Sequence, residues 1–456
     1  MIVRSRSQGP AARALRLELP AAGLPAGLRA GLPVVLPAAQ PDAPAPLIAR
    51  PVSAAGLQDA EAFLLRLGQA LHAHGTPADR LEQSVGSCAR ALGIEAQLFA
   101  TPTSFFAAFG PPGAQATHLV RVEPGEIDLG TLAELDGLTD LVERRQISPA
   151  EAEVRLAAVV SGPRVWSRFT TVLSFGVASG SAASFFGGSW AEVAASFLLG
   201  ALLGLMLQCC GHRPALTRVF EPAAAAMVTA LSLVAAHLVG LSAEVVTLSA
   251  LIVLVPGFTL TIAMSELATR HWASGTARLA GAGVVFLTLG FGVAMGRSVQ
   301  GLLPAALASD PLWAGALPTW AGVVALLISP MAFTVLFGAR KRDMPAIVVA
   351  GVAGYLGARF GAETLGPELG ACVGAVIVGA GSNLLASLSG RPALVTLVPG
   401  IMLLVPGSMG FRSVSSFLDR DAVSGLQAAF AMGLVATALV AGLLLAHALV
   451  PARRAL

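Results

Sequence analysis

Long apolar stretches dominate the chain from Trp166 onward. Ten of them follow one another, separated by short polar connections, at residues 169–186, 191–210, 223–240, 245–266, 277–296, 317–337, 344–360, 369–389, 393–414 and 425–449. Most approach the roughly 20 residues that a helix needs to cross about 30 Å of hydrocarbon, and the shorter ones are rich in glycine. The pattern predicts an α-helical polytopic membrane protein with ten transmembrane helices.

Before Trp166 the pattern is typical of a soluble domain. Apolar residues recur at helical spacing on both sides of a break at 74–77, which predicts an amphipathic helix pair. Between residues 94 and 122 apolar and polar positions alternate around a Pro/Gly turn, as in strands, and Ser148 is the predicted N-cap of a further helix. We expect a small soluble α+β domain at residues 57–165.

Composition supports the membrane class and excludes other classes. Of the 456 residues, 55% are hydrophobic and only 12% are charged, which is too apolar for a soluble fold of this length. The net charge of +3 comes from scattered basic residues, so a nucleic-acid partner is excluded. The four cysteines lack metal-site spacing, and we expect no disulfide framework, metal or cofactor. Residues 1–56, rich in Ala, Pro and Arg, are predicted to be a disordered tail.

Basic residues mark every second connection between the apolar stretches. They are Arg164, Arg168, Arg213, Arg218, Arg270, Arg278, Arg340, Lys341, Arg342, Arg391, Arg453 and Arg454. Short cytoplasmic loops carry the excess of Lys and Arg in membrane proteins. The distribution therefore places both termini in the cytoplasm.

A tetrapeptide recurs within the membrane region. Leu-Val-Pro-Gly occurs at 254–257, 397–400 and 404–407, and an offset of 150 residues also aligns the Ser-Gly pairs at 274 and 424. We infer two related halves of five helices each. Their predicted bounds are 166–298 and 317–456, with a periplasmic linker at 299–316. Because five is odd, the second half enters the membrane from the opposite side, which is the inverted-repeat plan of secondary transporters.

The Pro-Gly pairs of this tetrapeptide are the main candidates for a substrate or ion pathway. They are Pro256-Gly257, Pro399-Gly400 and Pro406-Gly407. A proline lacks the N–H that bonds the carbonyl four residues back, which frees the carbonyls of Ile252, Val395 and Met402. Such carbonyls persist in a membrane where neighbours satisfy them or where they face a polar cavity, as at the half-helix ends of transporters. A plain proline kink is the alternative interpretation.

Four polar residues complete the candidate pathway, each with a structural alternative. Glu266 could gate or relay protons, or be a solvated acid at a helix end. Glu221 has the same two interpretations, since a negative charge at a helix N-terminus is favourable in itself. Asn383, the only asparagine, would bond between helices or contact substrate, and Arg412 would bind a carboxylate or extend to the membrane interface.

An enzymatic alternative places a hydrolase site in the soluble domain, around Thr101, Thr103, Ser104 and His118. These residues lack a recognisable acid/base order, and hydroxyls in turns and strands are the simpler account. The membrane segment has no nucleotide-binding motif and no GxSxG motif. We therefore predict that the chain is not an enzyme and that transport uses an ion gradient or the gradient of the substrate.

Several of these motifs make the chain similar to the bacterial threonine/serine exporters. The matching residues are Gly75-Thr76-Pro77, Leu92-Gly93, Thr101-Pro102-Thr103-Ser104, Asp128-Leu129, Leu254 to Gly257 with Glu266 and Ser274-Gly275, and Leu397 to Gly407 with Arg412. The resemblance covers roughly residues 57–454. Where this family often has Asp, the chain has Glu266.

This resemblance implies export of threonine and serine across the bacterial inner membrane, driven by the proton motive force. The soluble domain would be a cytoplasmic regulatory or assembly element, and the partners would be a small-molecule substrate, protons and the lipid bilayer. Relatives with the two halves as separate subunits are linked to succinate export, so a dicarboxylate exporter is the alternative. A homo-oligomer is left open.

Overall fold

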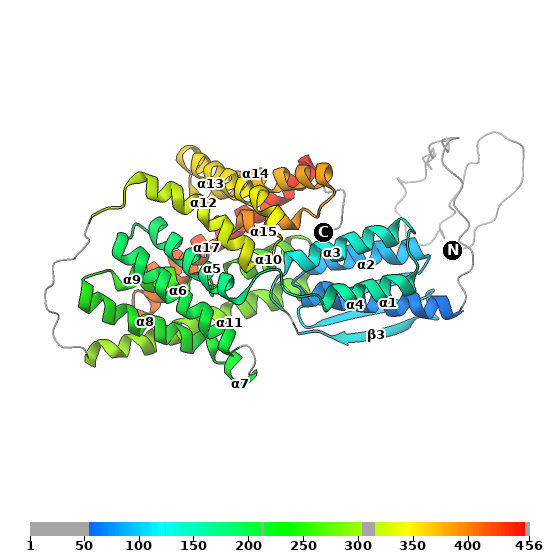
Figure 1. Ribbon diagram of the computed structural model, residues 1–456, viewed down its shortest axis with the longest axis horizontal. Helices are drawn as coiled ribbons and strands as arrows, with labels where there is room; N and C mark the ends of the chain where they lie inside the picture. Colours follow the sequence, from blue (N-terminus) through cyan, green and yellow to red (C-terminus); the bar gives the residue numbers. More distant parts are fainter. Residues whose placement is uncertain (1–53, 124, 211–213, 303–314, 452–456) are drawn as a thin grey trace, which may run out of the picture. The chain divides into compact units, whose positions relative to one another are not determined.

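The computed structural model describes residues 54–123, 125–210, 214–302 and 315–451. An α+β region comes first and is followed by a helical region (Figure 1). The predicted tail lies almost entirely outside the described residues.

The α+β region contains four helices and three strands. Its elements are α1 (Ala54–Ala73), α2 (Ala78–Leu92), β1 (Ala96–Thr101), β2 (Ser104–Phe109), β3 (Ala116–Arg121), α3 (Leu129–Glu143) and α4 (Pro149–Val160). The strands form an antiparallel sheet in the order β1-β2-β3, with Thr101 opposite Ser104 at the first turn. Phe105 and Phe109 are buried in a core with residues of α1, α2 and α3.

The predicted helix pair and the predicted N-cap of the later helix are confirmed. The Ser148 hydroxyl accepts a hydrogen bond from the Glu151 amide at 3.2 Å, at the start of α4. β2 and α3 were not predicted from the sequence. The signal for α3 was present, because apolar side chains recur at helical spacing from Leu129 to Val142 and the Asp128 carboxylate caps the Thr131 amide.

The helical region follows the predicted apolar stretches closely. Its elements are α5 (Arg168–Phe185), α6 (Trp190–Cys210), α7 (Pro214–Thr217), α8 (Phe220–Val239), α9 (Ala243–Leu251), α10 (Gly257–Ala268), α11 (Trp272–Arg297), η1 (Ser298–Leu302), α12 (Thr319–Leu336), η2 (Lys341–Asp343), α13 (Met344–Leu365), α14 (Pro367–Ser389), α15 (Leu394–Ile401), α16 (Gly407–Leu418) and α17 (Ala422–Leu449). Seven of the described helices are long and apolar enough to cross a membrane, namely α6, α8, α11, α12, α13, α14 and α17. The membrane class is confirmed.

The other three predicted spans correspond to α5 and to two interrupted segments. One interrupted segment is α9 followed by α10, and the other is α15 followed by α16. Neither α9, with 9 residues, nor α15, with 8 residues, is long enough to cross a membrane alone. The count of ten spans stays a prediction.

The order and packing of the helices are similar in the two halves. α10 and α16 each have 12 residues and begin 150 positions apart, at Gly257 and Gly407. α8 packs on α11 as α14 packs on α17, α10 packs on α11 as α16 packs on α17, and α6 packs on α9 as α13 packs on α15. Arg270 and Arg420, also 150 apart, both adopt a left-handed φ (69° and 61°) that is uncommon for residues other than glycine. The elements α8 to α11 thus have counterparts in α14 to α17.

The α+β region packs against the loop between α12 and α13 and against α15. The Leu129 amide donates to the Phe337 carbonyl at 2.8 Å, and the Trp166 indole donates to the Ala339 carbonyl at 2.8 Å. Leu394 and Val398 of α15 belong to the same buried cluster as the core of the α+β region. Burial of these apolar side chains holds the two regions together.

Candidate functional site

The two interrupted segments break in the same way. Pro256 (φ −79°, ψ 39°) and Pro406 (φ −80°, ψ 35°) have nearly identical backbone conformations, and each immediately precedes a new helix. Five residues separate the half-helices in each segment, at 252–256 and 402–406. The predicted breaks at Pro256 and Pro406 are therefore present as helix interruptions, wider than a proline kink.

The same short hydrogen bonds close each break. In the first, the Leu254 amide donates to the Leu251 carbonyl at 2.9 Å, and the Gly257 amide donates to the Val255 carbonyl at 2.8 Å. In the second, the Leu404 amide donates to the Ile401 carbonyl at 2.8 Å, and the Gly407 amide donates to the Val405 carbonyl at 2.9 Å. The two breaks thus have the same backbone hydrogen-bond pattern.

The two breaks lie against each other. A Cβ atom placed on Gly257 would lie 2.9 Å from the Cα of Gly407 and 2.5 Å from Cγ1 of Val405. A Cβ atom on Gly407 would lie 3.1 Å from Cγ1 of Val255. Only glycine at position 257 leaves room for this approach. The structure thus joins residues that are 150 positions apart in the sequence.

Each break exposes backbone groups of both polarities. Among the described residues, the carbonyls of Ile252 and Met402 accept no hydrogen bond. The last carbonyls of α9 and α15 carry partial negative charge, whereas the first amides of α10 and α16 carry partial positive charge. Backbone groups of opposite partial charge therefore lie close together at the paired breaks.

Protein surrounds the half-helices that lead into the breaks. Residues 246–251 of α9 are all buried, and so are residues 394–401 of α15 except Leu397. Irregular backbone at membrane depth is tolerated where protein or a polar cavity covers it. The half-helices before both breaks meet this condition, and the break residues 252–256 and 402–406 are themselves half-buried or buried.

The predicted third break, at Pro399-Gly400, is wrong. Pro399 lies inside α15, and Gly400 is a site of close helix packing. A Cβ atom on Gly400 would lie 2.8 Å from Val378 and 3.2 Å from Ala350. Burial against α13 and α14 keeps this segment helical although the proline removes one backbone hydrogen bond.

Glu266 is a fully buried carboxylate, 1% exposed, at the end of α10. It accepts hydrogen bonds from the Ala78 amide at 3.0 Å and from the Ser274 hydroxyl at 2.7 Å. The Arg278 Nε lies 3.1 Å from both of its oxygens. The interpretation of Glu266 as a solvated helix-end acid is therefore wrong. Its carboxylate joins α10, α11 and the first residue of α2.

Two histidines and a second carboxylate lie near Glu266. His271 is 3.5 Å from Glu82 of α2, and Glu82 also accepts the Ala100 amide at 2.8 Å. Burial raises the pKa of Glu82, although the bond from Ala100 opposes the shift. The His72 Nε2 donates to the Pro102 carbonyl at 2.9 Å, and burial lowers the pKa of this histidine. Ionisable groups thus line the contact between the α+β region and α10–α11.

The other predicted polar residues lie apart from the break. Asn383 donates from Nδ2 to the Val450 carbonyl at 2.8 Å, which is a bond between α14 and the end of α17. Arg412 is exposed, and its guanidinium stacks over the Phe186 ring with 6.0 Å to the centroid. Glu221 is half-buried in the first turn of α8, where it complements the helix dipole.

The candidate hydrolase residues do not assemble into a catalytic site. Thr101 and Ser104 are paired at the tight β1–β2 turn, where the Thr101 hydroxyl contacts the Ser104 carbonyl at 3.4 Å. His118 lies further along the sheet, opposite Ala107, and packs on Phe109 with 5.8 Å between ring centroids. The arrangement agrees with the simpler interpretation, in which these side chains belong to a turn and a strand.

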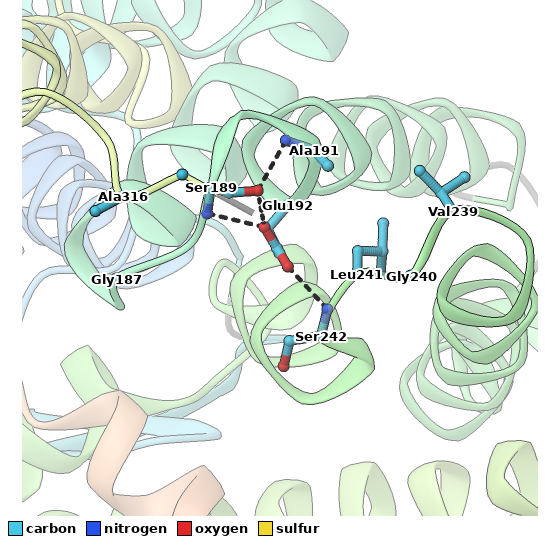
Figure 2. Close-up of a pocket in the computed structure, with 10 residues that line it drawn as sticks. Gly187, Ser189, Ala191, Glu192, Val239, Gly240, Leu241, Ser242 and Ala316 are labelled. Atoms are coloured by element: carbon cyan, nitrogen blue, oxygen red, sulfur yellow. Dashed lines mark hydrogen bonds between the residues drawn. The ribbon is translucent and has the colours of Figure 1, made fainter. Parts of the chain in front are cut away.

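A cavity of about 600 Å³ lies where the α5–α6 loop meets the α8–α9 loop. The buried Glu192 is at its edge and accepts from the Ser189 amide and the Ser242 amide, both at 2.8 Å, as Figure 2 shows. The Ser189 hydroxyl also donates to Glu192. Glu192 was not among the predicted site residues, although Ser189 to Glu192 has the spacing of a capping box.

Comparisons with known proteins agree with the resemblance in the sequence. The model of the threonine/serine exporter family matches residues 62–300, and a second threonine/serine exporter model matches residues 322–449. Pheromone-regulated membrane protein 10 of Pichia sorbitophila is 27% identical over 383 residues, covering 80% of this chain and 37% of the relative. The protein of the same name from Eremothecium gossypii is 26% identical over 375 residues, covering 79% and 50%. The chain thus spans about a third to a half of the length of these relatives. No solved structure matches the chain.

Proposed function

The chain belongs to the threonine/serine exporter family, and from this premise we propose that it is a secondary transporter that exports small polar amino acids such as threonine and serine. The contact between the two helix breaks at Gly257 and Gly407 is the main support. Half-helix ends that meet inside a bundle are where transporters of this kind bind substrate and coupling ions.

The chemistry of the break suits a zwitterion. The ammonium group of an amino acid would bind carbonyls that end α9 and α15, including those of Ile252 and Met402. Its carboxylate would bind free backbone amides in the first turns of α10 and α16, which follow Gly257 and Gly407. Both interactions use backbone groups, so the site would accept any amino acid whose side chain fits.

An inverted repeat of five plus five helices fits the contacts around α11. Glu266 at the end of α10 bonds to Ser274 and Arg278 near the start of α11. Arg297 at the other end of α11 bonds to Asp419 and Ser415 at the end of α16. Since α11 has 26 residues and is about 39 Å long, these contacts would place the ends of α10 and α16 on opposite sides of the membrane, with the two helices antiparallel. This supports halves at 166–298 and 317–456, joined at 299–316.

The proposed orientation places the α+β domain, residues 57–165, and both termini in the cytoplasm. In this orientation the domain covers the inner half of each broken segment, through Glu266 of α10 and through Leu394 and Val398 of α15. The structure would then represent a state closed to the cytoplasm. The matching relatives are yeast proteins, so the bacterial inner membrane gains no support from them and the location is proposed only as a cellular membrane.

The proton motive force is the proposed energy source. Glu266 and Glu192 are buried carboxylates on opposite sides of the first broken segment, and each holds a hydrogen bond between separate elements. Protonation would weaken those bonds, which is how a proton gradient could be coupled to opening. A dicarboxylate such as succinate is the second candidate substrate, because the exposed Arg412 guanidinium beside Phe186 could bind a second carboxylate.

Efflux from proteoliposomes tests the proposal. Vesicles containing the full chain are loaded with labelled threonine, serine or succinate, and efflux is followed with and without an imposed proton gradient. We expect threonine and serine efflux that the gradient accelerates. Efflux of succinate alone would replace the amino-acid assignment, and efflux of none of them would remove the proposal.

A further inference from the structure

One face of α6 forms a buried stripe that starts at the cavity. Its members are Glu192, Ser196, Gly200 and Gly204, spaced four residues apart, with Leu203 beside them. The opposite side of α6 is exposed, as at Leu198 (65%) and Leu205 (50%), and would face lipid. The stripe therefore lies on the inner side of the helix.

Two hydrogen-bond contacts align this stripe with α9 and α5. At the cavity, Glu192 accepts the amide of Ser242, the N-cap of α9. Eight residues further along both helices, the Ser179 hydroxyl of α5 donates to the Ala250 carbonyl at 3.4 Å, and Gly200 leaves the space that this hydroxyl occupies. Hence α6 and α9 run side by side in the same direction, from the cavity to the break at 252–256.

Unpartnered hydroxyls lie along this line. Ser196 and Ser249 are both 0% exposed, and neither Oγ has a hydrogen-bond partner among the described residues. Leaving a buried hydroxyl unpaired costs about 1–3 kcal/mol, so such groups call for an explanation. The second half does not repeat this feature, because Pro399 stands 150 positions after Ser249.

We propose that substrate passes between α5, α6 and α9 on its way from the break to the cavity, and that the Ser196 and Ser249 hydroxyls bind it there. This inference rests on the proposed export function. The ligand class is a small zwitterion with its own hydroxyl group, because a serine hydroxyl both donates and accepts and can pair with a substrate hydroxyl or ammonium. The cavity has the volume of a small-molecule site, about 300–1,000 Å³ in proteins generally, and would be the outer end of the route.

Thiol labelling tests the route without relying on transport. The four native cysteines, Cys88, Cys209, Cys210 and Cys372, are replaced, and Ser196→Cys or Ser249→Cys is introduced. A small, charged, membrane-impermeant thiol reagent is then added on the side of the cavity. Ser382→Cys is the matched control, because Ser382 of α14 is also buried (2%) with an unpartnered hydroxyl but lies off the route.

We expect both route cysteines to react at least tenfold faster than the control, and added threonine to slow them at least threefold. Reaction no faster than the control would overturn the route. Labelling without protection by threonine would overturn the binding role.

Transport by Ser249→Ala and Ser249→Thr gives the second measurement. We expect the alanine variant to lose at least tenfold in threonine efflux and the threonine variant, which keeps the hydroxyl, to retain most of it. Equal efflux from wild type and Ser249→Ala would refute the binding role while leaving export intact. Absence of efflux from the wild type would instead refute the proposed function, and the labelling rates would still report on the route.

Discussion

The carboxylate of Glu266 accepts a hydrogen bond from the backbone amide of Ala78, 188 positions earlier in the chain, at 3.0 Å. Ala78 is the first residue of α2, so the acid caps a helix of the α+β region from within the helical region. Arg278 balances the buried charge. Glu266 therefore connects the α+β region to the helical region through a buried hydrogen bond.

Removing the Glu266 side chain should destabilise the protein strongly. Glu266→Ala leaves the Arg278 guanidinium and the Ala78 amide without their acceptor, and loss of one partner of a buried ion pair costs about 3–5 kcal/mol. Glu266→Gln keeps an acceptor and should cost less. The measurement is thermal unfolding of purified protein together with limited proteolysis at the 161–167 connection.

Glu363→Gln is the control for this comparison. Glu363 pairs with Arg359 on an exposed helix face, where an ion pair contributes little. A Glu266→Ala protein as stable as this control would show that the link is unimportant.

Replacing the prolines of the breaks should reduce transport in a defined order. Pro256→Ala or Pro406→Ala restores an N–H and favours a continuous helix, which would remove the exposed backbone groups of the site. We expect at least a tenfold loss of efflux, or about 1.4 kcal/mol at the affected step. Glycine at either position should do less harm, because it leaves the backbone easy to unwind.

Pro399→Ala is the internal control for the prolines, since Pro399 already lies inside a helix. Its efflux should stay near the wild-type value at matched expression. Near-wild-type efflux from both Pro256→Ala and Pro406→Ala would mean that the breaks are scaffold.

The contact between the breaks predicts a steric effect at Gly257. Gly257→Ala places a methyl group 2.5 Å from Val405 and 2.9 Å from Gly407, and overpacking of this kind costs about 1–3 kcal/mol. Gly283→Ala in α11 meets nothing within 4 Å and should be neutral or stabilising by up to about 1 kcal/mol. Comparing the unfolding temperatures of the two variants checks this. A Gly257→Ala protein as stable as Gly283→Ala would contradict the close approach.

The buried His72 predicts a loss of stability in mild acid. Burial lowers its pKa below the ordinary value of 6.5, so the unfolded chain binds this proton more readily than the folded chain. The contribution of His72 is therefore complete above pH 6.5 and declines as the pH falls below that value. His72→Gln, which does not titrate, should flatten the unfolding temperature between pH 7.5 and pH 5. An unchanged pH profile would rule out His72 as the cause.

Topology follows from the positions of the basic residues. Reporter fusions after Arg342 and after Arg454 should both give a cytoplasmic signal, because each follows an even number of predicted spans. A signal from the opposite side at either position would break the ten-span arrangement and, with it, the antiparallel relation of α10 and α16.

Local chemistry was enough to predict much of this protein. The apolar stretches coincide with α5, α6 and α8–α17, the helix pair around residues 74–77 is α1–α2, and Ser148 caps α4. Two of the three Pro-Gly positions are breaks, and the 150-residue offset recurs in the starts of α10 and α16. These features depend on the missing N–H of proline, on hydropathy and on spacing, all of which act within a few residues of the chain.

Only the tertiary structure decided which of these groups meet. Pro399 and Pro406 have the same local sequence, yet the first stays helical because Gly400 packs closely against α13 and α14. The sequence gives no sign that Glu266 and Glu192 are buried. In the structure, each accepts a hydrogen bond from the backbone amide of a distant element, Ala78 for Glu266 and Ser242 for Glu192. The burial of a charge, and the choice of its partner, depend on segments far apart in sequence that the fold brings together, so no local pattern contains them.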